Sequence, residues 1–367
     1  MAGVLVHEWI ATTGGSENVL EAMSRMYPDA DVVCLWNDSA DRFQPDRVHE
    51  TWLSRTPLRK SKALALPFMP ATWRALPNRA YDWALISSHL FAHHARFTGT
   101  GASFRRYVYV HTPARYIWNP ELDERGNSFA VRALAAALKP LDRARARETH
   151  EFAANSTFVQ ARIARAWGVQ SRVIHPPVEV EAIQDVDSWR GRLTGGDTAV
   201  MDSLPTDYVL GASRFIPYKR LDRVIRTGEM MGLPVVLAGK GPELARLRAL
   251  GAAASVPVHI VPAPSHPLLY ALYEGAALYV FPAVEDFGIM PVEAMAAGAP
   301  VLAQSFGGAA ESVVPGRTGA LASFESDTEL RDAIDVALAT DRANRREHAR
   351  SFSASRFTRE ISSWIGS

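Results

Sequence analysis

Cysteine is almost absent from this sequence, and the single residue present is Cys34. One thiol cannot form a disulfide within the chain, so disulfide bonding is excluded as a source of stability. The first eight residues also lack the basic start and the long apolar core of a signal peptide. Together these absences favour a cytoplasmic protein.

An excess of charge of one sign is missing as well. Lys and Arg number 40 against 39 for Asp and Glu, which leaves a net charge of +1. Such a chain has no global field to gather nucleic acid, so nucleic acid is excluded as an expected partner and any basic site must be local. No apolar run approaches the roughly 20 residues that cross a bilayer. The chain can therefore lie on a membrane but is not expected to span one.

Internal repeats, coiled-coil heptads and low-complexity tracts are also lacking. What remains is a chain of 367 residues, 47% hydrophobic and 22% charged, which is an ordinary globular composition. Its length suits two domains of typical size.

Short apolar runs alternate with helical or loop segments along the first half of the chain. Residues 4–6 predict a buried strand, and the turn at Gly14 and Gly15 leads into a helix over residues 16–23. Similar runs follow at 31–36, 83–87, 107–111 and 171–175. This alternation predicts a parallel sheet with helices on both faces, in a first domain over residues 1–178.

The same pattern restarts after a stretch from residue 176 to about 205, which has little periodic apolar content and predicts a linker. A second doubly wound domain is expected over residues 200–349. Aromatic and aliphatic residues at near-helical spacing then predict a terminal helix within residues 350–367. We expect this helix to pack back on the first domain, although packing on the second would give the same pattern. The strands expected in the second domain are 208–211, 234–239, 258–261, 277–281 and 300–303.

The segment 281–300 combines a strand end, a glycine loop and a helix start. Pro291 suits a first helical position, which places Glu293 in the first turn and Glu285 at the carboxyl end of the strand. Free amides at such a turn can bind a diphosphate, and a carboxylate accepts hydrogen bonds from ribose hydroxyls. A simple preference of glutamates for the positive end of a helix would give the same placement.

Arg214 and Lys219 follow the first strand of the second domain. Two cations beside such a loop can neutralise a diphosphate leaving group in place of a divalent metal. Solvated surface charge is the alternative interpretation of this pair.

In combination these motifs resemble family 4 glycosyltransferases of the GT-B fold, an α/β class with two Rossmann-like domains facing across a cleft. The resemblance covers nearly the whole chain. Glu285 and Glu293, with seven residues between them, match the signature of that family. Arg214 with Lys219 matches its phosphate-binding pair. Further matches are the turn at Gly14 and Gly15 and the segments 154–156, 174–178 and 239–242.

The resemblance implies a nucleotide-sugar donor held mainly by the second domain. Glu293 would hold the ribose, and Arg214 with Lys219 would hold the diphosphate. Glu285 would hold hydroxyls of the donor sugar, and His111 would reach the same sugar from the first domain, so these two are the implied catalytic residues. The other implied donor-binding positions are Gly14, Gly15, Asp286, Phe287, Gly288 and Ile289.

Residues 111–116 resemble a motif often seen in bacterial mannosyltransferases of the family, which favours mannose as the transferred sugar. GDP-mannose is the leading donor, with a UDP-hexose close behind. The nucleobase stays open because residues 261–264 carry no glycine where relatives usually have one. The resemblance further implies retention of configuration, no metal and no cofactor beyond the donor substrate.

The acceptor is expected to be a hydroxyl of a saccharide, a lipid-linked saccharide or a small molecule. Arg55, Arg59, Lys60 and Lys62 lie next to the apolar residues 63–69. This neighbourhood suits either peripheral contact with the inner face of a membrane or an acceptor-side loop. The alternative function is a catalytically silent subunit that binds a nucleotide sugar for a partner enzyme.

A histidine cluster in the first domain has a spacing found in metal sites. His89 and His93 are four residues apart, and His94 follows directly. No third ligand is evident from the sequence, and no glutamate accompanies the first histidine. We therefore predict surface or loop histidines and no metal site.

Overall fold

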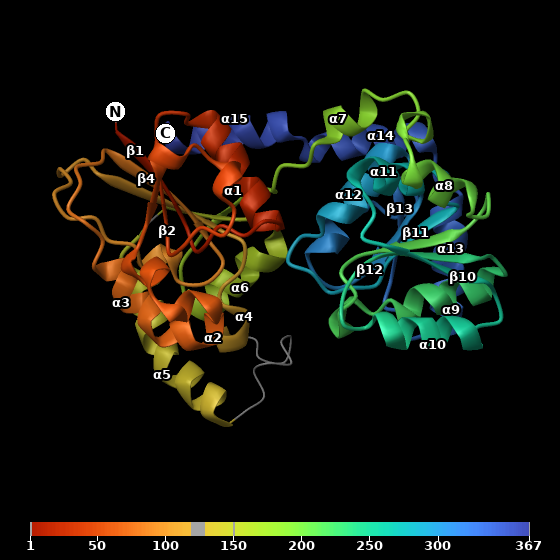
Figure 1. Cartoon of the computed structure of the whole chain (residues 1–367), viewed down its shortest axis with the longest axis horizontal. Coiled ribbons are helices and arrows are strands. Elements are labelled where there is room, and N and C mark those ends of the chain that lie inside the picture. The colour runs from red at the N-terminus through yellow and green to blue at the C-terminus, as the bar shows by residue number, and fades with distance from the viewer. Residues whose placement is uncertain (1, 119–128, 150, 367) are drawn as a thin grey trace. The chain divides into compact units, whose positions relative to one another are not determined.

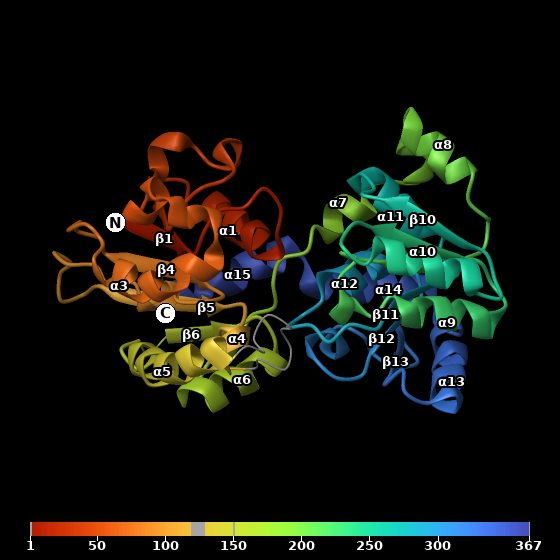
Figure 2. The same cartoon turned by 60° about the horizontal axis from the view of Figure 1, so that its bottom comes forward.

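A computed structural model describes residues 2–118, 129–149 and 151–366 of the chain. The fold consists of two compact units, one comprising Met1–Pro177 with Phe357–Ser367 and the other Val178–Arg356. In each unit helices cover both faces of a parallel sheet (Figures 1 and 2). The predicted pair of Rossmann-like α/β domains is thereby confirmed. Within the described residues, no helix is both long and apolar enough to cross a membrane.

The first unit is built on a seven-stranded sheet in the order β3-β2-β1-β4-β5-β6-β7. All neighbouring strands run parallel. Because both faces are covered, the central strands are mostly apolar and buried; all five residues of β1, for example, are buried. The strands are β1 Gly3–His7, β2 Asp31–Cys34, β3 Val48–Glu50, β4 Trp83–Ser88, β5 Arg105–Val110, β6 Glu151–Ala154 and β7 Arg172–Val173.

Helices of the first unit fill both layers. They are α1 Gly15–Met26, α2 Lys62–Ala65, α3 Met69–Arg74, α4 Arg115–Trp118, α5 Phe129–Ala146, α6 Thr157–Trp167 and α15 Ala354–Ile365. The intervening 3₁₀ turns are η1 Ala40–Arg42, η2 Pro45–Arg47, η3 Trp52–Arg55, η4 Pro57–Lys60, η5 Leu66–Phe68 and η6 Ala92–His94.

The last helix, α15, packs on the sheet of the first unit. Phe357, Ile361 and Trp364 are spaced four and three residues apart, so they share one helical face, and all three are fully buried. They join one apolar core with side chains of α1, beside which α15 lies in Figure 1. The indole N–H of Trp364 also donates a hydrogen bond of 3.0 Å to Glu151 at the start of β6. The carboxyl end of the chain thus completes the first unit.

The second unit is built on a six-stranded parallel sheet in the order β10-β9-β8-β11-β12-β13. Its strands are β8 Val209–Ala212, β9 Val235–Gly239, β10 Val258–Pro262, β11 Leu278–Phe281, β12 Val301–Gln304 and β13 Gly319–Ala322. Its helices are α7 Val180–Gln184, α8 Gly196–Asp202, α9 Asp222–Met231, α10 Leu244–Ala253, α11 His266–Gly275, α12 Ile289–Ala297, α13 Asp327–Leu338 and α14 Arg342–Ala349, with 3₁₀ turns η9 Arg190–Arg192, η10 Pro217–Lys219, η11 Gly308–Glu311 and η12 Arg350–Phe352.

The prediction of a linker between residue 176 and about 205 is wrong. This stretch forms the short helices α7 and α8, and Val180, Ile183 and Met201 are buried in a core of the second unit. The apolar residues are too widely spaced to give a periodic pattern, but they suffice to anchor two short helices of one to two turns each. The segment therefore belongs to the second unit rather than joining two separate bodies.

Each sheet reverses its strand order at one point. In the first unit β1 lies between β2 and β4, and in the second β8 lies between β9 and β11. Parallel α/β sheets bind ligands outside the carboxyl ends of the strands at such points. The loops after β1, β4, β8 and β11 are therefore the places to look for a functional site.

Candidate functional site

The loop after β11 carries most of the candidate donor site in the second unit. Glu285 lies in it, four residues beyond the last strand residue, Phe281. Gly288 ends the loop with a φ of 87°, in the left-handed region, and caps α12. A Cβ at this position would lie 2.9 Å from the Cβ of Ala309. Glycine is therefore required here on grounds of both conformation and space.

Helix α12 begins earlier than the sequence predicted. Its first residue is Ile289, so Pro291 occupies the third position and Glu293 the fifth. The expectation that Glu293 lies in the first turn is wrong. The amides of the first turn have no acceptor within the helix, so proline is tolerated at the third position as well as the first. Glu293 consequently lies one turn into the helix and does not cap its amino end.

Lys219 and Glu285 form an ion pair between the loops that follow β8 and β11. The ammonium of Lys219 contacts the Glu285 carboxylate, and the two side chains are 10% and 16% exposed. Lys219 also lies 5.4 Å from the ring centroid of Phe281. The resemblance assigns Lys219 to the diphosphate of the donor and Glu285 to its sugar. In this structure the two side chains neutralise each other.

Arg214 differs from Lys219 in its surroundings. Its guanidinium is exposed, and it donates a hydrogen bond of 3.3 Å to the hydroxyl of Tyr218. Among the described residues it has no ion-pair partner. The edge of this sheet therefore presents one cation already neutralised by Glu285 and a second that is open to an anion.

Glu293 faces an environment that disfavours its charged form. Burial raises its pKa to about 7, and the nearby Tyr273 hydroxyl lowers it in part. The Glu293 charge in turn helps to raise the pKa values of Tyr270, Tyr273 and Tyr279, after burial. Tyr273 and Tyr279 stack edge to face at 5.1 Å. This carboxyl therefore changes its charge near neutral pH.

A second glycine loop supports the first, and the sequence analysis missed it. Gly307 and Gly308 follow β12, and the amide of Gly308 donates a hydrogen bond of 2.7 Å to the Glu285 carbonyl. A Cβ on Gly308 would lie 2.0 Å from the carbonyl oxygen of Asp286. The signal was a Gly-Gly pair after an apolar run, the same signal that identified Gly14 and Gly15. This loop fixes the backbone that carries Glu285, Asp286 and Phe287.

In the first unit, a hydrogen-bonded chain links three strand ends. Ser87 Oγ on β4 lies 3.0 Å from Nδ1 of His7 on β1 and 2.8 Å from Nε2 of His111, which follows β5. Burial lowers the pKa of His7 to about 4 and that of His111 to about 3. His89, 5.4 Å from His7 between ring centroids, also has its pKa lowered by burial. The cluster is therefore neutral near pH 7.

The Ser87 hydroxyl couples the tautomers of its two imidazole partners. It has one proton, so it donates to one ring and accepts from the other. When Ser87 donates to Nε2 of His111, that ring carries its proton on Nδ1; when Ser87 accepts, Nδ1 is the acceptor. His111 can thus present either a donor or an acceptor without a change of charge.

The turn at Gly14 and Gly15 starts α1, with Gly14 as its capping residue. Glu17 lies buried over this turn, where its carboxylate accepts hydrogen bonds from the Ala11 amide at 3.3 Å and the Ser16 hydroxyl at 2.8 Å. A Cβ on Gly14 would lie 2.0 Å from Glu17 Oε2. An anion bound at this turn would therefore meet a carboxylate already in place.

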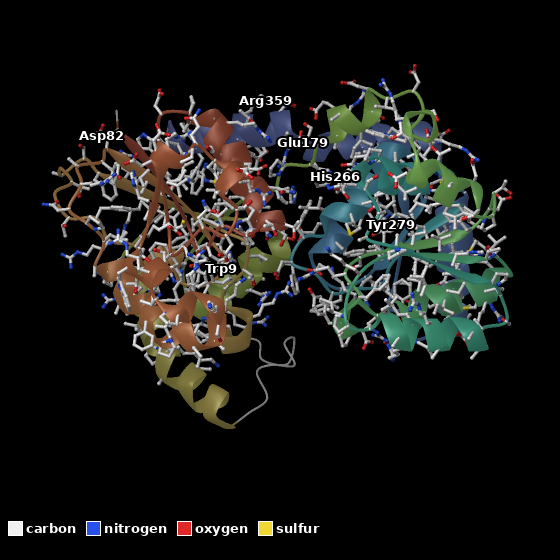
Figure 3. All side chains as sticks on the ribbon, viewed as in Figure 1. Trp9, Asp82, Glu179, His266, Tyr279 and Arg359 are labelled. Atoms are coloured by element: carbon white, nitrogen blue, oxygen red, sulfur yellow. The ribbon has the colours of Figure 1, made fainter. Side chains whose placement is uncertain are left out.

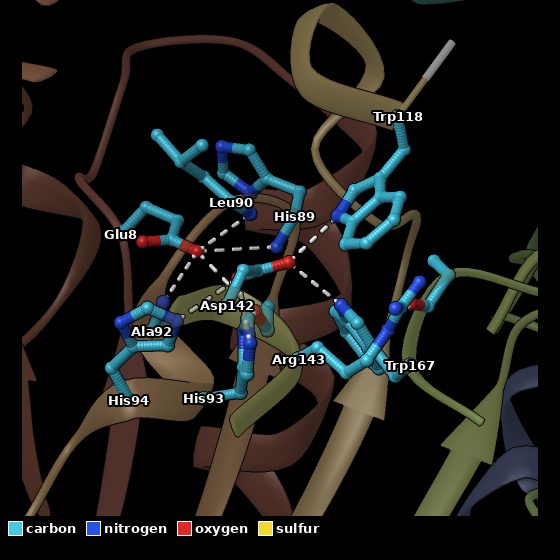
Figure 4. Close-up of polar contacts among 12 residues, drawn as sticks. Glu8, His89, Leu90, Ala92, His93, His94, Trp118, Asp142, Arg143 and Trp167 are labelled. Carbon is cyan, nitrogen blue, oxygen red and sulfur yellow. Dashed lines mark hydrogen bonds and ion pairs between the residues drawn. The ribbon is translucent and has the colours of Figure 1, made fainter. Parts of the chain in front are cut away.

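His93 and His94 lie in the connection between β4 and β5, as loop histidines would, but they are buried and not on the surface, and a third residue joins them (Figure 4). The Nε2 atoms of His93 and His94 lie 3.1 and 2.9 Å from Oδ1 of Asp142. The indoles of Trp118 and Trp167 donate to Oδ2, each at 2.7 Å. Within the described residues this is the one group with a geometry that could hold a metal ion.

The surroundings of Asp142 favour an internal polar network over a metal centre. Burial by itself would raise the pKa of Asp142, but ion pairing and hydrogen bonding with His93 and His94 outweigh it and lower that pKa. Both carboxylate oxygens are already occupied, which satisfies a charge in the core. The network ties η6, α4, α5 and α6 together. Nearby, buried Glu8 accepts amide hydrogen bonds from Leu90 and Ala92, each at 2.8 Å.

Two family models match the chain and together span most of it. "Glycosyltransferase Family 4" matches residues 13–182, and "Glycosyl transferases group 1" matches residues 204–354. The two matches fall mainly in the first and the second unit respectively, so each unit is similar to glycosyltransferase domains. Curated relatives include the D-inositol 3-phosphate glycosyltransferases of Mycobacterium tuberculosis and Mycobacterium bovis, each 34% identical over 177 residues. The matched region covers 44% of this chain and only 35% of those relatives.

Solved structures share the fold over nearly the whole chain. Anabaena HepE in complex with UDP-glucose matches with a TM-score of 0.71 at 19% identity, over 99% of both chains. Sucrose-phosphate synthase from Thermosynechococcus elongatus matches with a TM-score of 0.70 at 18% identity, over 100% of this chain and 98% of that one. The predicted GT-B fold class is confirmed.

The candidate residues thus fall into two groups. Within the second unit the structure brings Lys219 and Glu285 into contact, with Arg214 on the loop after β8 and Glu293 one turn into α12. The loop residues Asp286 to Gly288 connect Glu285 to Ile289, the first residue of that helix. In the first unit His111 joins His7, Ser87 and His89. Tyr279 and Trp9, labelled in Figure 3, lie beside these two groups respectively.

The raised pKa of Glu293 predicts a pH-dependent stability. A carboxyl whose pKa is higher in the folded state than in the unfolded state contributes stability below its unfolded pKa. This contribution is lost as pH rises toward the folded pKa. Relative to wild type, Glu293→Gln should therefore gain stability between pH 4.5 and about 7. The gain is at most about 3 kcal/mol, at about 1.4 kcal/mol per pKa unit. Urea denaturation of both proteins across this range measures it.

Glu347→Gln, at an exposed position on α14, is the matched control and should show no such trend. A difference between wild type and Glu293→Gln that stays constant from pH 4.5 to 7 would contradict the assignment.

Proposed function

We propose that this protein is a retaining hexosyltransferase that moves a sugar from a nucleotide-sugar donor to an acceptor hydroxyl without a metal ion. The observation that carries the proposal is the meeting of Lys219 with Glu285 at the carboxyl edge of the second sheet, beside the loop that holds Arg214. Cations, a carboxylate and the amino end of α12 gather there in the combination that a sugar diphosphate requires.

The ion pair between Lys219 and Glu285 marks the place where the diphosphate of the donor would bind. A diphosphate is a stronger partner for Lys219 than one carboxylate, and Arg214 can hold a second set of phosphate oxygens. Once Lys219 turns to the diphosphate, Glu285 is released to accept hydrogen bonds from hydroxyls of the donor sugar. Glu293, when ionised, accepts hydrogen bonds from the ribose.

Transfer then proceeds by attack of the acceptor hydroxyl on the anomeric carbon, on the face from which the diphosphate leaves. The bond from that carbon to the diphosphate oxygen breaks as the new glycosidic bond forms. The departing diphosphate takes the acceptor proton, and Arg214 with Lys219 stabilises its charge. His111 contributes a neutral hydrogen bond to the sugar, since burial keeps its pKa at about 3.

Mannose is the favoured sugar, on the strength of residues 111–116. GDP-mannose and a UDP-hexose are both retained as donors, and the UDP-glucose complex of HepE supports the second. In the turn after β10, the Ala263 amide donates a hydrogen bond of 3.1 Å to the Gly239 carbonyl, which places this turn beside the β9 loop. The acceptor is a saccharide, a lipid-linked saccharide or a small molecule. The reaction is assigned to the cytoplasm.

Substitution of Glu285 and substitution of Glu293 should change the affinities for different ligands. Losing a charge-assisted hydrogen bond costs roughly 1.5 to 3 kcal/mol, so Glu293→Gln should weaken the nucleoside diphosphate and the intact donor alike by about one to two decades. Glu285→Gln should not weaken binding of the nucleoside diphosphate, because Lys219 then has no competing carboxylate, while transfer from the intact donor falls. Calorimetry with GDP, UDP and the corresponding sugar nucleotides measures these affinities.

If Glu285→Gln weakens the bare diphosphate as much as Glu293→Gln does, the division of roles between the two glutamates fails. If the wild-type protein binds a sugar nucleotide but neither transfers nor hydrolyses it, the catalytically silent binding subunit becomes the better description.

Metal independence has its own test. Arg214 and Lys219 supply the positive charge that a divalent ion would otherwise provide, so transfer should continue at an undiminished rate in EDTA. Loss of transfer in EDTA, with recovery on addition of magnesium or manganese, would overturn this part of the proposal.

We also propose peripheral membrane contact through the segment 51–81 of the first unit. Trp52, Leu64 and Phe68 are 49%, 65% and 45% exposed, and the rings of Trp52 and Phe68 meet edge to face at 6.4 Å. The segment contains six basic residues and no acidic one. Arg59, Arg74 and Arg79 pair with Asp38, Glu148 and Asp31 respectively. Exposed apolar side chains beside the other three cations, Arg55, Lys60 and Lys62, suit an anionic lipid surface.

This surface adjoins the histidine cluster. The ammonium of Lys62 lies 4.0 Å from the ring centroid of Trp9, and Trp9 meets His89 edge to face at 4.8 Å. An acceptor anchored in lipid at this surface would have its saccharide within reach of the same strand ends that carry His111. The proposal therefore favours the lipid-linked class of acceptor.

The protein should sediment with vesicles of phosphatidylglycerol and not with phosphatidylcholine alone. Trp52→Ser with Leu64→Ser should reduce binding at least tenfold, because each large apolar side chain gains about 1.5 to 3 kcal/mol on burial. Val336→Ser with Leu338→Ser, exposed to a similar degree on α13, is the matched control. Equal loss in both double variants, or no binding by wild type, would remove the membrane surface from the proposal.

A further inference from the structure

An arginine-rich cavity lies at the amino ends of the strands of the first sheet, whereas His111 lies at their carboxyl ends. Its volume is about 740 Å³. Arg105 begins β5, whereas His111 follows the end of that strand, so the two edges are roughly 20 Å apart at about 3.3 Å per residue. The cavity is lined by Arg74, Arg96, Phe97, Phe104, Arg105, Arg106, Glu148, Thr149 and Glu151.

Positive charge exceeds negative charge in this lining, and the two carboxylates are already engaged. Glu148 accepts hydrogen bonds from Arg74 and Arg145, each at 2.6 Å. Glu151 accepts the indole N–H of Trp364 at 3.0 Å. Arg96 is exposed, and its guanidinium makes no ion pair with any residue that the structure describes. The cavity therefore offers cationic donors that its own carboxylates do not neutralise.

Arg106 shows how closely these cations lie together. It is partly buried and donates hydrogen bonds to the backbone carbonyls of Ala95 and Glu148. Burial lowers its pKa; the Glu148 charge raises it, and the charges of Arg74 and Arg96 lower it further. Three guanidinium groups thus repel one another around one space. An anion placed between them would relieve that repulsion and use their remaining N–H groups.

A buried polar atom points to a ligand independently of the charges. Thr149 is only 5% exposed and lines the cavity, yet its hydroxyl oxygen has no hydrogen-bond partner among the described residues. Buried hydroxyls are ordinarily hydrogen-bonded, and leaving one unpaired is costly. A bound oxyanion would accept the Thr149 proton as well as guanidinium N–H groups.

Two aromatic residues add an apolar wall. Phe97 and Phe104 meet edge to face, with ring centroids 6.1 Å apart. A free inorganic ion would use only the arginines and Thr149, whereas an organic phosphate can also cover these rings. The cavity is large enough for a small organic molecule by the usual range of ligand sites.

We propose that this cavity binds a soluble, phosphate-bearing small molecule, with Arg96, Arg106 and Thr149 as its phosphate contacts. Neither donor binding nor sugar transfer, as proposed above, uses these residues. The site is therefore distinct from the candidate donor site, which lies in the second unit.

Inorganic pyrophosphate is the probe, because its binding depends on the phosphate contacts alone. Titration calorimetry of the full-length wild-type protein should show binding that Arg96→Glu weakens at least tenfold. Thr149→Val, which removes the hydroxyl and keeps the shape, should weaken it in the same direction. Arg165→Glu reverses an exposed arginine of the first unit outside the cavity and should have no effect. Thermal melting checks that each variant remains folded.

Pyrophosphate is also expected at Arg214 and Lys219, so the two sites must be told apart. Arg214→Ala with Lys219→Ala should leave the binding event that depends on Arg96 intact, and this holds even if the proposed donor site is wrong. If Arg96→Glu and Thr149→Val leave all pyrophosphate binding unchanged, the cavity proposal is overturned. Loss of vesicle sedimentation in Arg96→Glu, with pyrophosphate binding unchanged, would assign the arginines to phospholipid headgroups and overturn it too.

Discussion

Backbone-to-backbone packing of neighbouring loops is the constraint on which the second unit depends. A Cβ on Gly239 would lie 1.8 Å from the Ser213 carbonyl oxygen, and one on Gly308 would lie 2.0 Å from that of Asp286. The loops after β8 and β9, and those after β11 and β12, therefore hold each other in place without intervening side chains. Because each loop is fixed by its neighbour, Lys219 and Glu285 meet although they lie on different loops.

The two units offer a ligand different electrostatics. The second unit presents Lys219 and Arg214, whose positive charges can neutralise a diphosphate. It also presents the Glu293 carboxyl, which changes its charge near pH 7. The first presents the imidazoles of His7 and His111, which burial keeps neutral. In the proposed reaction the leaving group develops charge while the transferred sugar needs only orientation. The charged groups of the second unit suit the diphosphate, and the neutral imidazoles of the first unit suit orientation of a sugar.

Local pattern predicted both sheets, because parallel strands buried on both faces are continuous apolar runs. It missed β3, β6 and β13, which are short or begin with polar residues. It placed the start of α12 two residues late, since proline fits several first-turn positions. Asp142 could not be found as the partner of His94, because 48 residues separate them and only the fold brings them together. The Glu285 to Glu293 loop was found because its glycine, its proline and its carboxylates are adjacent in sequence.

The return of α15 to the first unit bears on how the chain folds during synthesis. A ribosome releases the amino-terminal unit first, and such units ordinarily fold as they emerge. Here the first unit lacks Phe357, Ile361 and Trp364 until the second unit has been made. The part of the sheet that α15 covers stays exposed beside α1 while the second unit is translated. The nascent first unit is thus a natural client for chaperones that shield apolar surface until α15 has been synthesised.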